Sequence, residues 1–516
     1  MSAENLTEIL DKNAETAVGK IKTWSSRPEK KSEFLYQDIK QASLRFSLML
    51  HDQGIKQGDR IMLWGSNSPE WVIAYFGALK SGAAVVPFDV NRDPEFLSKV
   101  VQSTNPRFII AGEAQRKTVP ENNAVPIINI EGVSRVPEVV NYKTALDVSR
   151  SDIAEIVFTS GTTGNPKGVV LNHGNILSNV EAIQKVVEIK PDYKLLSILP
   201  LSHMFETTVG LLTPINSGAG ITYIDTLQPS SILTAMQDER ITCMAVVPEA
   251  LKLFKKGIEQ YVTKSGKERE FNFMRRLSPK LPELLRRIMF KTVQEKMGGN
   301  FEFFVCGGAR LDPLVADFWE DLGIKVLQGY GMTEASPVVS CDTMEERDHR
   351  YVGYPLPGVE VKITEDGEVL VKGANVMQGY FNNKAATERV LEGEWYHTGD
   401  LGSMDEGKLK LVGRKGNMIV LSNGLNVYPE DIEEILSQQN AESVVFSKHI
   451  GEKEELHAVL LLKDSKSDPK DIVNSANKHL SSHQRIQGWT VWPDEDFPRT
   501  QKLEAKRDEI IKKVTL

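Results

Sequence analysis

Short apolar runs alternate with helical patterns along most of the chain. The runs RIMLWG, AAVVPF, RFIIAG, EIVFTS, KLLSILP and FEFFVCGG have the length and composition of buried strands. Between the first two, SPEWVIAYFGALKSG places Trp71, Ile73, Phe76 and Leu79 near one helical face. Strands that alternate with helices in this way predict an α/β fold with mostly parallel sheets covered by helices.

Towards the C-terminus the strands become shorter and richer in turns, as in VEVKITEDGEVLVKG and GKLKLVGR, which predicts a small β-region. A helix at YPEDIEEILSQQ and a strand at LHAVLLLKD then indicate a separate α+β unit. Gly413 and Gly416 in GRKGN make the backbone more flexible between the turn-rich β-region and the α+β unit. We therefore expect a large N-terminal domain, residues 1–412, and a small mobile C-terminal domain, residues 413–516, with a hinge near 414–417.

The composition excludes several classes of protein. Hydrophobic residues make up 41% of the chain and charged residues 26%, as in soluble globular proteins. A net charge of −8 argues against a general nucleic-acid binder. No apolar run is long enough to span a membrane, and the N-terminal segment lacks the apolar core of a secretory signal. Cys243, Cys306 and Cys341 stand alone, so we expect neither a disulfide framework nor a zinc site, and a reducing cytoplasmic location.

The tract from Lys252 to Lys296 is a basic exception in this acidic chain. It holds 13 Lys and Arg against 5 Asp and Glu, with large apolar residues between them. One interpretation is an amphipathic helical hairpin that packs its apolar side on the domain. The other is a surface attracted to an anionic membrane or to a polyphosphate ligand.

The stretch FTSGTTGNPKGVVLNHGN, Phe158 to Asn175, has the composition of a phosphate-binding loop. It departs from the P-loop pattern because glycine follows Lys167 and because Pro166 would obstruct a helix that begins there. Glycine amides and hydroxyl groups can point at one anion, while the lysine adds a mobile positive charge. The alternative is a solvent-exposed loop of turn-forming residues. The residues expected to bind phosphate are Thr159, Ser160, Gly161, Thr162, Thr163, Gly164 and Lys167.

A second motif, QGYGMTEASP, combines an aromatic ring, a hydroxyl and a carboxylate. Tyr330 can stack on a purine, Thr333 offers a hydroxyl to a phosphate, and Glu334 is a hard oxygen ligand of the kind that magnesium prefers. The alternative is a turn at a strand end with a capping glutamate. Asp400 in TGD can accept hydrogen bonds from both hydroxyls of a diol, although a solvated turn charge would look the same.

Together these motifs resemble those of the adenylate-forming superfamily, which includes acyl-CoA synthetases, peptide-synthetase adenylation domains and luciferases. TSGTTGNPKG is similar to the phosphate loop of that superfamily. PLSHMFE, FFVCGGARL, QGYGMTEASP, YHTGDLG, GRKGNMIVLSNGLNVYPEDIE and FPRT follow in the expected order. The resemblance extends over nearly the whole chain, and a series of this kind is far more specific than any single motif.

The resemblance implies a site for ATP and magnesium. It assigns Tyr330 to adenine, Thr333 to phosphate, and Thr159 with Glu334 to the metal. It assigns Asp400 and Arg414 to the ribose hydroxyls. The other nucleotide-site residues that it implies are Gly308, Ala309, Gln328, Gly329, Gly331 and Met332.

The same resemblance places further residues around the reacting groups. His203 in LSHMFE would lie near the substrate carboxylate, although a lone histidine is often structural. Gly416 would occupy the hinge, since glycine permits the change in φ and ψ that a domain rotation needs. Asn423 and Gly424 in SNGLN would lie towards the thiol tunnel.

The reaction that the resemblance implies has two steps. A carboxylate attacks the α-phosphorus of ATP and expels pyrophosphate, and a thiol then attacks the acyl-adenylate and releases AMP. Such chemistry needs positioning and charge neutralisation more than a protein nucleophile. A site of glycines, hydroxyls, lysine and magnesium fits that need.

The last motif departs from the family pattern, which places a catalytic lysine four residues after its threonine. PRTQKLEAKR has Glu504 at that place, and a carboxylate there would repel both phosphate and substrate. Three alternatives follow. A shifted loop uses Lys506, it uses Lys502, or adenylation is impaired or supported by another group.

The chain looks most like bacterial medium-to-long-chain fatty-acyl-CoA synthetases. We therefore expect a fatty-acid:CoA ligase that uses ATP, magnesium and coenzyme A. GRKGNMIVLSNGLNVYP leaves no room for the insertion found in relatives that load carrier proteins, which favours CoA as acceptor. The alternatives are a fatty-acyl-ACP ligase and a nucleotide-binding homologue that lost catalysis at Glu504. We expect the protein to be cytoplasmic, with peripheral membrane contact through residues 252–296 as an option.

Overall fold

The computed structural model describes residues 3–15, 18–92, 94–119, 124–137, 147–159, 166–421, 426–439, 441–450, 453–462, 468–500 and 504–515. The chain forms two compact units, the first of Met1–Glu360 with Val371–Tyr396 and the second of Val361–Leu370 with His397–Leu516. Strands β16 (Val359–Ile363), β17 (Glu368–Gly373) and β20 (Trp395–Asp405) each pass from one unit into the other. The predicted boundary between residues 412 and 413 stays a prediction.

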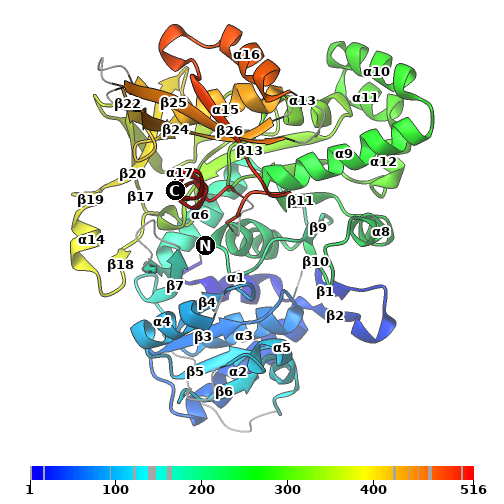
Figure 1. The fold of residues 1–516 in the computed structure, drawn as a ribbon. Helices are drawn as coiled ribbons and strands as arrows, with labels where there is room; N and C mark the ends of the chain where they lie inside the picture. Colours follow the sequence, from blue (N-terminus) through cyan, green and yellow to red (C-terminus); the bar gives the residue numbers. More distant parts are fainter. Residues whose placement is uncertain are drawn as a thin grey trace. The chain divides into compact units, whose positions relative to one another are not determined.

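The first unit contains a nine-stranded sheet with a parallel centre (Figure 1). Strands β13, β12, β11, β9, β10 and β1 are parallel neighbours, and antiparallel strands β14, β15 and β2 extend the two edges. In spatial order the strands are β15 (Tyr354–Pro355), β14 (Val338–Cys341), β13 (Lys325–Gly331), β12 (Phe303–Cys306), β11 (Cys243–Val246), β9 (Lys194–Ser197), β10 (Gly220–Ile224), β1 (Lys20–Trp24) and β2 (Ser32–Leu35).

A seven-stranded sheet in the same unit follows the same plan. Strands β7, β4, β3, β5 and β6 are parallel, and β8 and β18 add an antiparallel edge beside β7. In spatial order its strands are β18 (Gly379–Tyr380), β8 (Lys167–Asn172), β7 (Ile153–Thr159), β4 (Ala84–Phe88), β3 (Arg60–Trp64), β5 (Phe108–Ala111) and β6 (Ile127–Asn129). All six predicted strands are therefore confirmed, as β3, β4, β5, β7, β9 and β12.

Helices connect these strands, as the alternation in sequence predicts. The α-helices of the first unit are α1 (Leu6–Asn13), α2 (Tyr36–Asp52), α3 (Pro69–Lys80), α4 (Pro94–Thr104), α5 (Glu113–Arg116), α6 (His173–Val186), α7 (Thr213–Ser217), α8 (Pro229–Glu239), α9 (Pro248–Lys264), α10 (Glu268–Leu277), α11 (Glu283–Met289), α12 (Lys291–Lys296), α13 (Pro313–Asp321) and α14 (Lys384–Glu388). Shorter elements are η1 (Pro28–Lys30), η2 (Ile130–Arg135), the π-helix η3 (Glu206–Leu212), η4 (Ser278–Lys280), η5 (Thr333–Ala335) and β19 (Leu391–Glu392).

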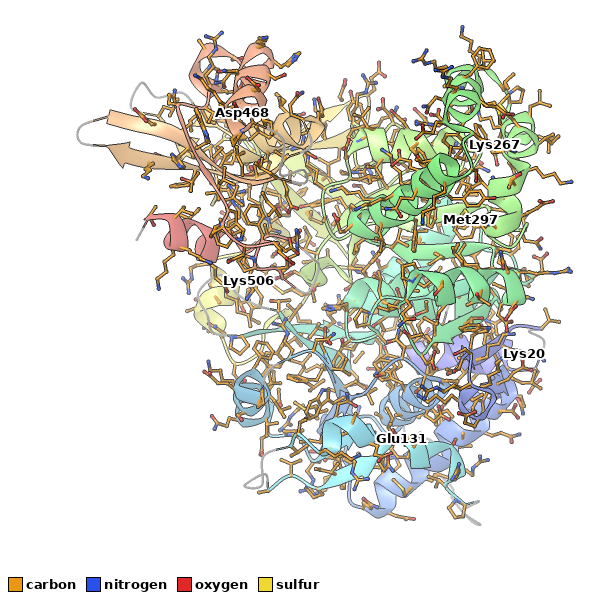
Figure 2. The ribbon with its side chains drawn as sticks, turned by 45° about the vertical axis from the view of Figure 1, so that its right-hand side comes forward. Lys20, Glu131, Lys267, Met297, Asp468 and Lys506 are labelled. Atoms are coloured by element: carbon orange, nitrogen blue, oxygen red, sulfur yellow. The ribbon has the colours of Figure 1, made fainter. Side chains whose placement is uncertain are left out.

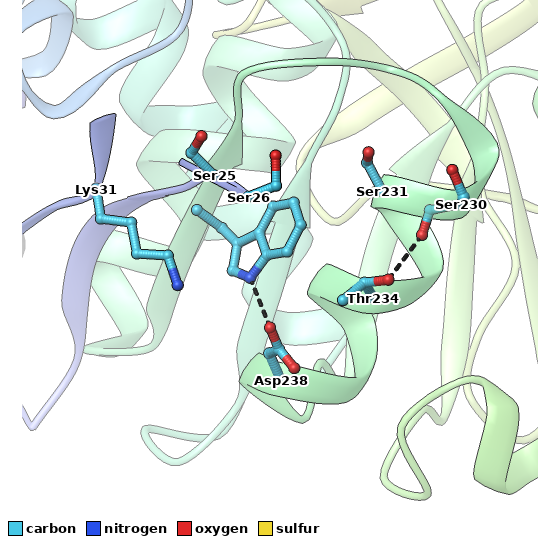
Figure 3. A pocket seen from close by; sticks show the side chains of 8 residues that line it. Ser25, Ser26, Lys31, Ser230, Ser231, Thr234 and Asp238 are labelled. Atoms are coloured by element: carbon cyan, nitrogen blue, oxygen red, sulfur yellow. Dashed lines mark hydrogen bonds between the residues drawn. The ribbon is translucent and has the colours of Figure 1, made fainter. Parts of the chain in front are cut away.

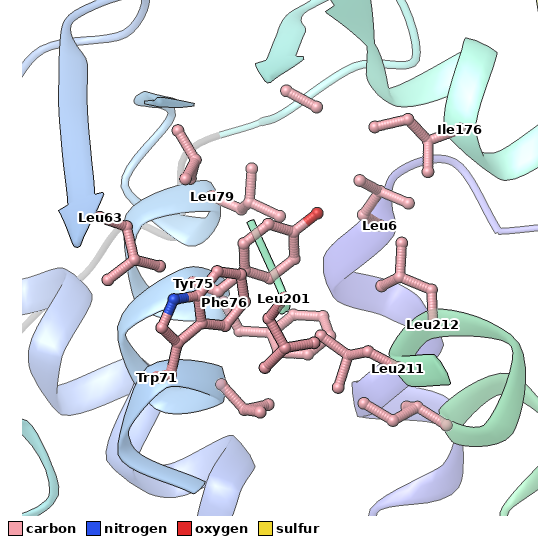
Figure 4. Packing of buried hydrophobic residues seen from close by; sticks show 14 of the residues in the cluster. Leu6, Leu63, Trp71, Tyr75, Phe76, Leu79, Ile176, Leu201, Leu211 and Leu212 are labelled. Atoms are coloured by element: carbon pink, nitrogen blue, oxygen red, sulfur yellow. The ribbon is translucent and has the colours of Figure 1, made fainter. Parts of the chain in front are cut away.

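Helix α3 shows how the predicted pattern becomes a core. The Ser68 hydroxyl caps its first turn by accepting a hydrogen bond from the Trp71 amide at 3.1 Å. Its apolar side chains are buried on every face, and Figure 4 shows Trp71 and Phe76 among leucines from distant parts of the chain. A Cβ on Gly77 would lie 2.6 Å from Phe46 Cδ1, so glycine lets α2 pack closely on α3. Each large side chain buried in this way contributes roughly 1.5–3 kcal/mol to folding.

The second unit is a small α+β structure, as predicted. Strands β20 and β21 (Lys408–Arg414) form an antiparallel hairpin, and β24, β25 and β26 form a three-stranded sheet. Helices α15 and α16 bury Ile432, Leu436 and Val473 in a core shared with β24 and β25. The remaining bounds are β22 (Ile419–Val420), β23 (Asn426–Val427), α15 (Pro429–Gln438), β24 (Ala441–Ile450), β25 (Lys453–Leu462), α16 (Pro469–His479), η6 (Ser482–Gln484), β26 (Gly488–Val491) and α17 (Arg507–Thr515).

Candidate active site

The two ends of the predicted phosphate loop face each other across a hairpin. Thr159 at the end of β7 pairs with Lys167 at the start of β8, and both residues are half-buried. Because a strand rather than a helix follows Lys167, the loop is not a P-loop. The predicted phosphate ligands Ser160, Gly161, Thr162, Thr163 and Gly164 lie outside the described residues.

The predicted metal ligand Glu334 lies in η5, close to the antiparallel edge of the seven-stranded sheet. The Tyr380 hydroxyl on β18 donates a hydrogen bond to Glu334 Oε1 at 2.9 Å. Lys167 Nζ lies 5.4 Å from the centre of the Tyr380 ring, because β18 pairs with β8. The structure thus connects two of the predicted site residues, Lys167 and Glu334, through a tyrosine that the sequence interpretation missed. No motif or spacing distinguishes Tyr380 in the sequence.

A second tyrosine, Tyr396, belongs to the same surroundings. Burial raises its pKa far above the ordinary value, and the charge of Glu334 and the proximity of Tyr380 add to the rise. Burial and Glu334 likewise raise the pKa of Tyr380. Both hydroxyls therefore stay protonated. Tyr330, the predicted adenine contact, is itself buried on β13.

The glycines of QGYGMTE serve a close backbone approach. A Cβ on Gly331 would lie 1.8 Å from the Pro337 carbonyl oxygen, and one on Gly329 would lie 3.3 Å from that of Ser340. The chain turns back here, with the Met332 amide donating to the Pro337 oxygen at 2.8 Å. Thr333 and Glu334 occupy this turn, so the tight return of β14 onto β13 sets their positions.

The segment after β12 lies against the LSHMFE motif. A Cβ on Gly307 would lie 3.2 Å from the ring of Phe205, so the glycine accommodates that aromatic side chain. Gly308, with φ +86°, occupies the left-handed region, and Gly308 and Ala309 are half-buried. Phe205 joins two motifs that the sequence interpretation treated separately.

Gln328 combines an anchored backbone with an unsatisfied side chain. Its amide donates to Asp342 Oδ2 at 3.0 Å, and burial raises the pKa of Asp342 to about 7. Its own Oε1 is buried, and within the described part of the chain it has no hydrogen-bond partner. An acceptor of this kind fits a ligand that carries an amino group, such as adenine.

His203 is held by a buried carboxylate. Its Nε2 lies 3.0 Å from Oδ2 of Asp89, whose side chain is 5% exposed while that of His203 is 31% exposed. Burial alone would raise the pKa of Asp89, but the hydrogen bonds from His203 and the Asn91 amide hold it below the ordinary value. Asp89 therefore stays ionised and orients the imidazole. One signal in the sequence points to Asp89, which directly follows the strand AAVVPF.

The predicted ribose contacts lie together in the second unit. Asp400 on β20 and Arg414 on β21 are paired in register, and Arg414 Nε donates to Asp400 Oδ1 at 3.1 Å. A Cβ on Gly416 would meet no atom within 4 Å, and its φ is outside the left-handed region, so packing does not require glycine there. The thiol-side residues Asn423 and Gly424 lie outside the described residues.

In the C-terminal motif, backbone hydrogen bonds join residues 498–500 to residues 504–506. The Thr500 amide donates to the backbone carbonyl oxygen of Glu504 at 2.7 Å, and the Lys506 amide donates to that of Pro498 at 2.8 Å. Glu504 itself is exposed. Lys506 Nζ forms an ion pair of 2.8 Å with Glu509. Lys502, the other candidate, lies outside the described residues.

A magnesium ion fits Glu334 as a single protein carboxylate. Among the described residues no group of three or more His, Cys, Asp or Glu is placed to hold a metal. Magnesium commonly binds to one or two carboxylates plus substrate phosphates and waters, so this arrangement suits an ion that arrives with a nucleotide. The Tyr380 hydroxyl is the neutral partner that orients the carboxylate.

The first unit also has a cavity away from these residues. Trp24, Lys31, Ser230 and Asp238 are among the side chains that line this space of about 310 Å³ (Figure 3). The Trp24 indole donates to Asp238 at 3.0 Å. None of the predicted site residues lines it, so it is separate from the candidate site.

Two family models match this chain. Residues 10–381 match the model for "AMP-binding enzyme", and residues 416–515 match that for "AMP-binding enzyme C-terminal domain". Long chain acyl-CoA synthetase 7 of Arabidopsis thaliana is 29% identical over 76% of this chain and 63% of its own length. The medium-chain fatty-acid–CoA ligase of Escherichia coli is 28% identical over 79% of this chain and 72% of its own.

Solved structures show the same fold. ATP-bound MatB from Rhodopseudomonas palustris aligns with a TM-score of 0.81 at 21% identity, over 99% of this chain and 98% of MatB. A Mycobacterium tuberculosis fatty acyl CoA synthetase aligns with a TM-score of 0.71 at 21% identity, over 99% of this chain and 98% of that protein's chain. These likenesses concern the fold, which they match over nearly the whole length of the chain. The chain belongs to the AMP-binding enzyme family.

Proposed function

We propose that this chain is an ATP-dependent fatty-acid:CoA ligase that releases AMP and pyrophosphate. In the first step a fatty-acid carboxylate oxygen bonds to the α-phosphorus of ATP and the bond to pyrophosphate breaks. In the second step the CoA sulfur bonds to the acyl carbon, its proton is lost to solvent, and AMP leaves. One observation carries the proposal. Tyr380 contacts both Lys167, at the start of β8 in the hairpin of β7 and β8, and Glu334.

Each of these groups has a task in the first step. Lys167 would neutralise phosphate charge, and Glu334, oriented by Tyr380, would hold magnesium, which when bound offsets the charge that develops on the leaving pyrophosphate. Gln328 Oε1 would accept a hydrogen bond from the adenine amine. His203, oriented by Asp89, would lie beside the incoming carboxylate.

The second unit would complete the site in turn. Asp400 and Arg414 would hold the ribose hydroxyls, and Lys506 or Lys502 would replace the lysine missing at Glu504. Gly416 would act as the hinge, and the lack of any packing demand for glycine there supports a role in a different conformation. The assignment of residues 413–516 as the moving domain belongs to this proposal.

The choice of acid and of acceptor rests on the named relatives. The Arabidopsis and Escherichia coli proteins are named for long-chain and medium-chain fatty acids and for CoA. An acyl carrier protein is the alternative acceptor. Burial raises the pKa of the three free cysteine thiols, so they stay protonated and unreactive. We propose a reducing cytoplasm as the location of the protein. Contact of residues 252–296 with a membrane surface would bring the enzyme to an apolar substrate.

A pyrophosphate-exchange screen tests the proposal. Acids from acetate to long-chain fatty acids, together with aryl acids, are offered with ATP and magnesium, and CoA and holo-carrier protein are then compared as acceptors. We expect exchange that depends on a medium- or long-chain fatty acid and thioester formation with CoA. Exchange with aryl acids alone would contradict the proposed fatty-acid substrate. ATP binding without any exchange would favour the alternative that the chain is a catalytically impaired homologue.

A further inference from the structure

The helices between Lys267 and Met297 carry an exposed face with an unusual composition. Figure 2 shows side chains projecting from these helices between the two labelled residues. None of the helices in the described part of the chain has the length and apolar character that crossing a bilayer requires. The basic apolar face, as we name it, comprises the exposed apolar residues Phe273, Leu277, Leu284, Leu285 and Ile288 and the exposed cations Arg276, Lys280 and Lys291.

The fold does not need the apolar residues of this face. They are between 42% and 69% exposed. The inner side of the same helices is occupied by Phe271, Met274 and Phe290, which pack into the core, with the rings of Phe271 and Phe290 5.5 Å apart. The packing interpretation of the basic tract is therefore right for its inner side. It leaves the outer side without a partner in the described residues.

Some cations of the tract are used by the fold, and others are not. Arg286 donates to the Leu281, Glu320 and Pro279 carbonyls, and Arg287 to those of Phe301 and Gly323, so these guanidinium groups hold the helices together. In the described part of the chain no hydrogen bond or ion pair engages the side chain of Arg276 or that of Lys280.

The remaining charges leave this face positive. Lys291 is exposed and lies 3.6 Å from Glu295 on the next turn. Between Phe271 and Lys291 the one acidic residue in the sequence is Glu283, which forms an ion pair of 2.6 Å with Lys325. The face is therefore positive in a chain whose net charge is −8.

We infer that the basic apolar face docks on an anionic lipid bilayer. On α10, Phe273, Arg276 and Leu277 have the i, i+3, i+4 spacing of one helical face, and on α11 Leu284 and Ile288 are four residues apart. Apolar side chains at these positions enter the boundary between headgroups and acyl chains, while Arg and Lys stay level with the phosphates. A bilayer satisfies both kinds of side chain at once.

Two other occupants fit this face less well. A soluble polyphosphate would use the cations but leave the apolar residues exposed, and the arginine pair best suited to it, Arg286 with Arg287, already binds carbonyl groups. A second copy of the chain would bring Arg276 and Lys280 against the same positive face. Like charges directly opposed in an interface cost affinity.

Vesicle co-sedimentation tests the inference without any turnover, so its outcome is independent of the proposed ligase activity. The chain is mixed with vesicles of phosphatidylcholine alone or of phosphatidylcholine with phosphatidylglycerol. We expect binding to the anionic vesicles only, and weaker binding as salt is added. Removal of the three cations in R276Q/K280Q/K291Q should lower the partition by on the order of 100-fold, since each contributes about fivefold.

Matched variants separate this face from general charge and apolarity. K56Q/K117Q/K384Q changes the net charge equally at exposed lysines elsewhere and should bind like the parent. F273S/L284S/I288S should lose binding, whereas the exposed Leu314→Ser on α13 should not. Equal loss in the lysine control, unchanged binding in F273S/L284S/I288S, or no preference for anionic vesicles would overturn the inference. So would light scattering that shows a dimer lost in F273S/L284S/I288S.

Discussion

The candidate residues of the two units differ in how firmly the structure holds them. In the first unit, Glu334 and His203 each have a partner from a distant segment, Tyr380 and Asp89. In the second, the Arg414 side chain is 70% exposed and that of Lys506 is 44% exposed. The ion pair of Lys506 is with Glu509, only three residues away in the sequence. Exposed pairs of this kind contribute about 1 kcal/mol or less. The candidate residues Glu334 and His203 of the first unit are thus held by partners from distant segments, whereas the side chains of Arg414 and Lys506 in the second unit are more exposed.

Replacement of Glu334 should have the largest effect. The variant Glu334→Gln keeps a partner for Tyr380 but removes the charge that would hold magnesium. We expect fatty-acid-dependent pyrophosphate exchange to fall by about 10²–10³-fold. The exposed Glu388→Gln on α14 is the control and should behave like the parent. Exchange within threefold of the parent in Glu334→Gln would show that the metal is held elsewhere.

The lysines near Glu504 come next. If one of them replaces the missing family lysine, Lys506→Ala or Lys502→Ala should lower pyrophosphate exchange by about 10²-fold. Lys512→Ala, an exposed lysine on α17, serves as control. If the double variant exchanges at the rate of the parent, the replacement hypothesis is wrong and another group supports adenylation.

Glu206, which lies in the same LSHMFE motif as His203, tests how burial of a carboxyl group affects stability. Burial raises its pKa from the ordinary 4.5 to about 8, and the hydrogen bond from Ser197 offsets this only in part. The folded state therefore keeps a proton that the unfolded state loses, and stability should fall as the pH rises from about 4.5 to about 8. Between about pH 6 and about pH 8 the free energy of unfolding should drop by about 2 kcal/mol. Urea titrations should show this slope in the parent, and a Glu206→Gln variant with the same slope would contradict the assignment.

Asp89 should give the smallest of these effects. Asp89→Ala removes the hydrogen bond that orients His203, and we expect kcat for acyl-CoA formation to fall about tenfold with little change in the KM for ATP. Asp89→Asn retains a hydrogen-bonding group and should stay within about threefold of the parent. Equal losses in the two variants would indicate that the charge of Asp89, not its hydrogen bond, matters.

The architecture was predictable because it depends on local patterns. The strand RIMLWG and the helix SPEWVIAYFGALKSG appear where the sequence places them, since burial on both faces demands continuous apolar runs. The order of strands in the sheets was not predictable, because pairing such as that of β18 with β8 joins segments far apart in the chain. Nothing local in the sequence specifies those partners.

The site was predictable only where a motif carries its own chemistry. Glu334 and Lys167 belong to such motifs, whereas Tyr380 becomes a partner of Glu334 only when β18 pairs with β8. Asp89 likewise meets His203 across a large sequence separation. The glycines of QGYGMTE were interpreted around a ligand, yet for Gly331 the approach of the Pro337 oxygen is a sufficient reason.

Product analysis with labelled ATP tests the proposed activity most directly. The full chain is incubated with magnesium, CoA and ATP labelled at the α-phosphate in one sample and at the γ-phosphate in another, with and without a long-chain fatty acid. We predict AMP and pyrophosphate in equal amounts with acyl-CoA, and none without the acid. Release of ADP and orthophosphate, or AMP release that does not depend on the acid, would contradict adenylate formation at Glu334.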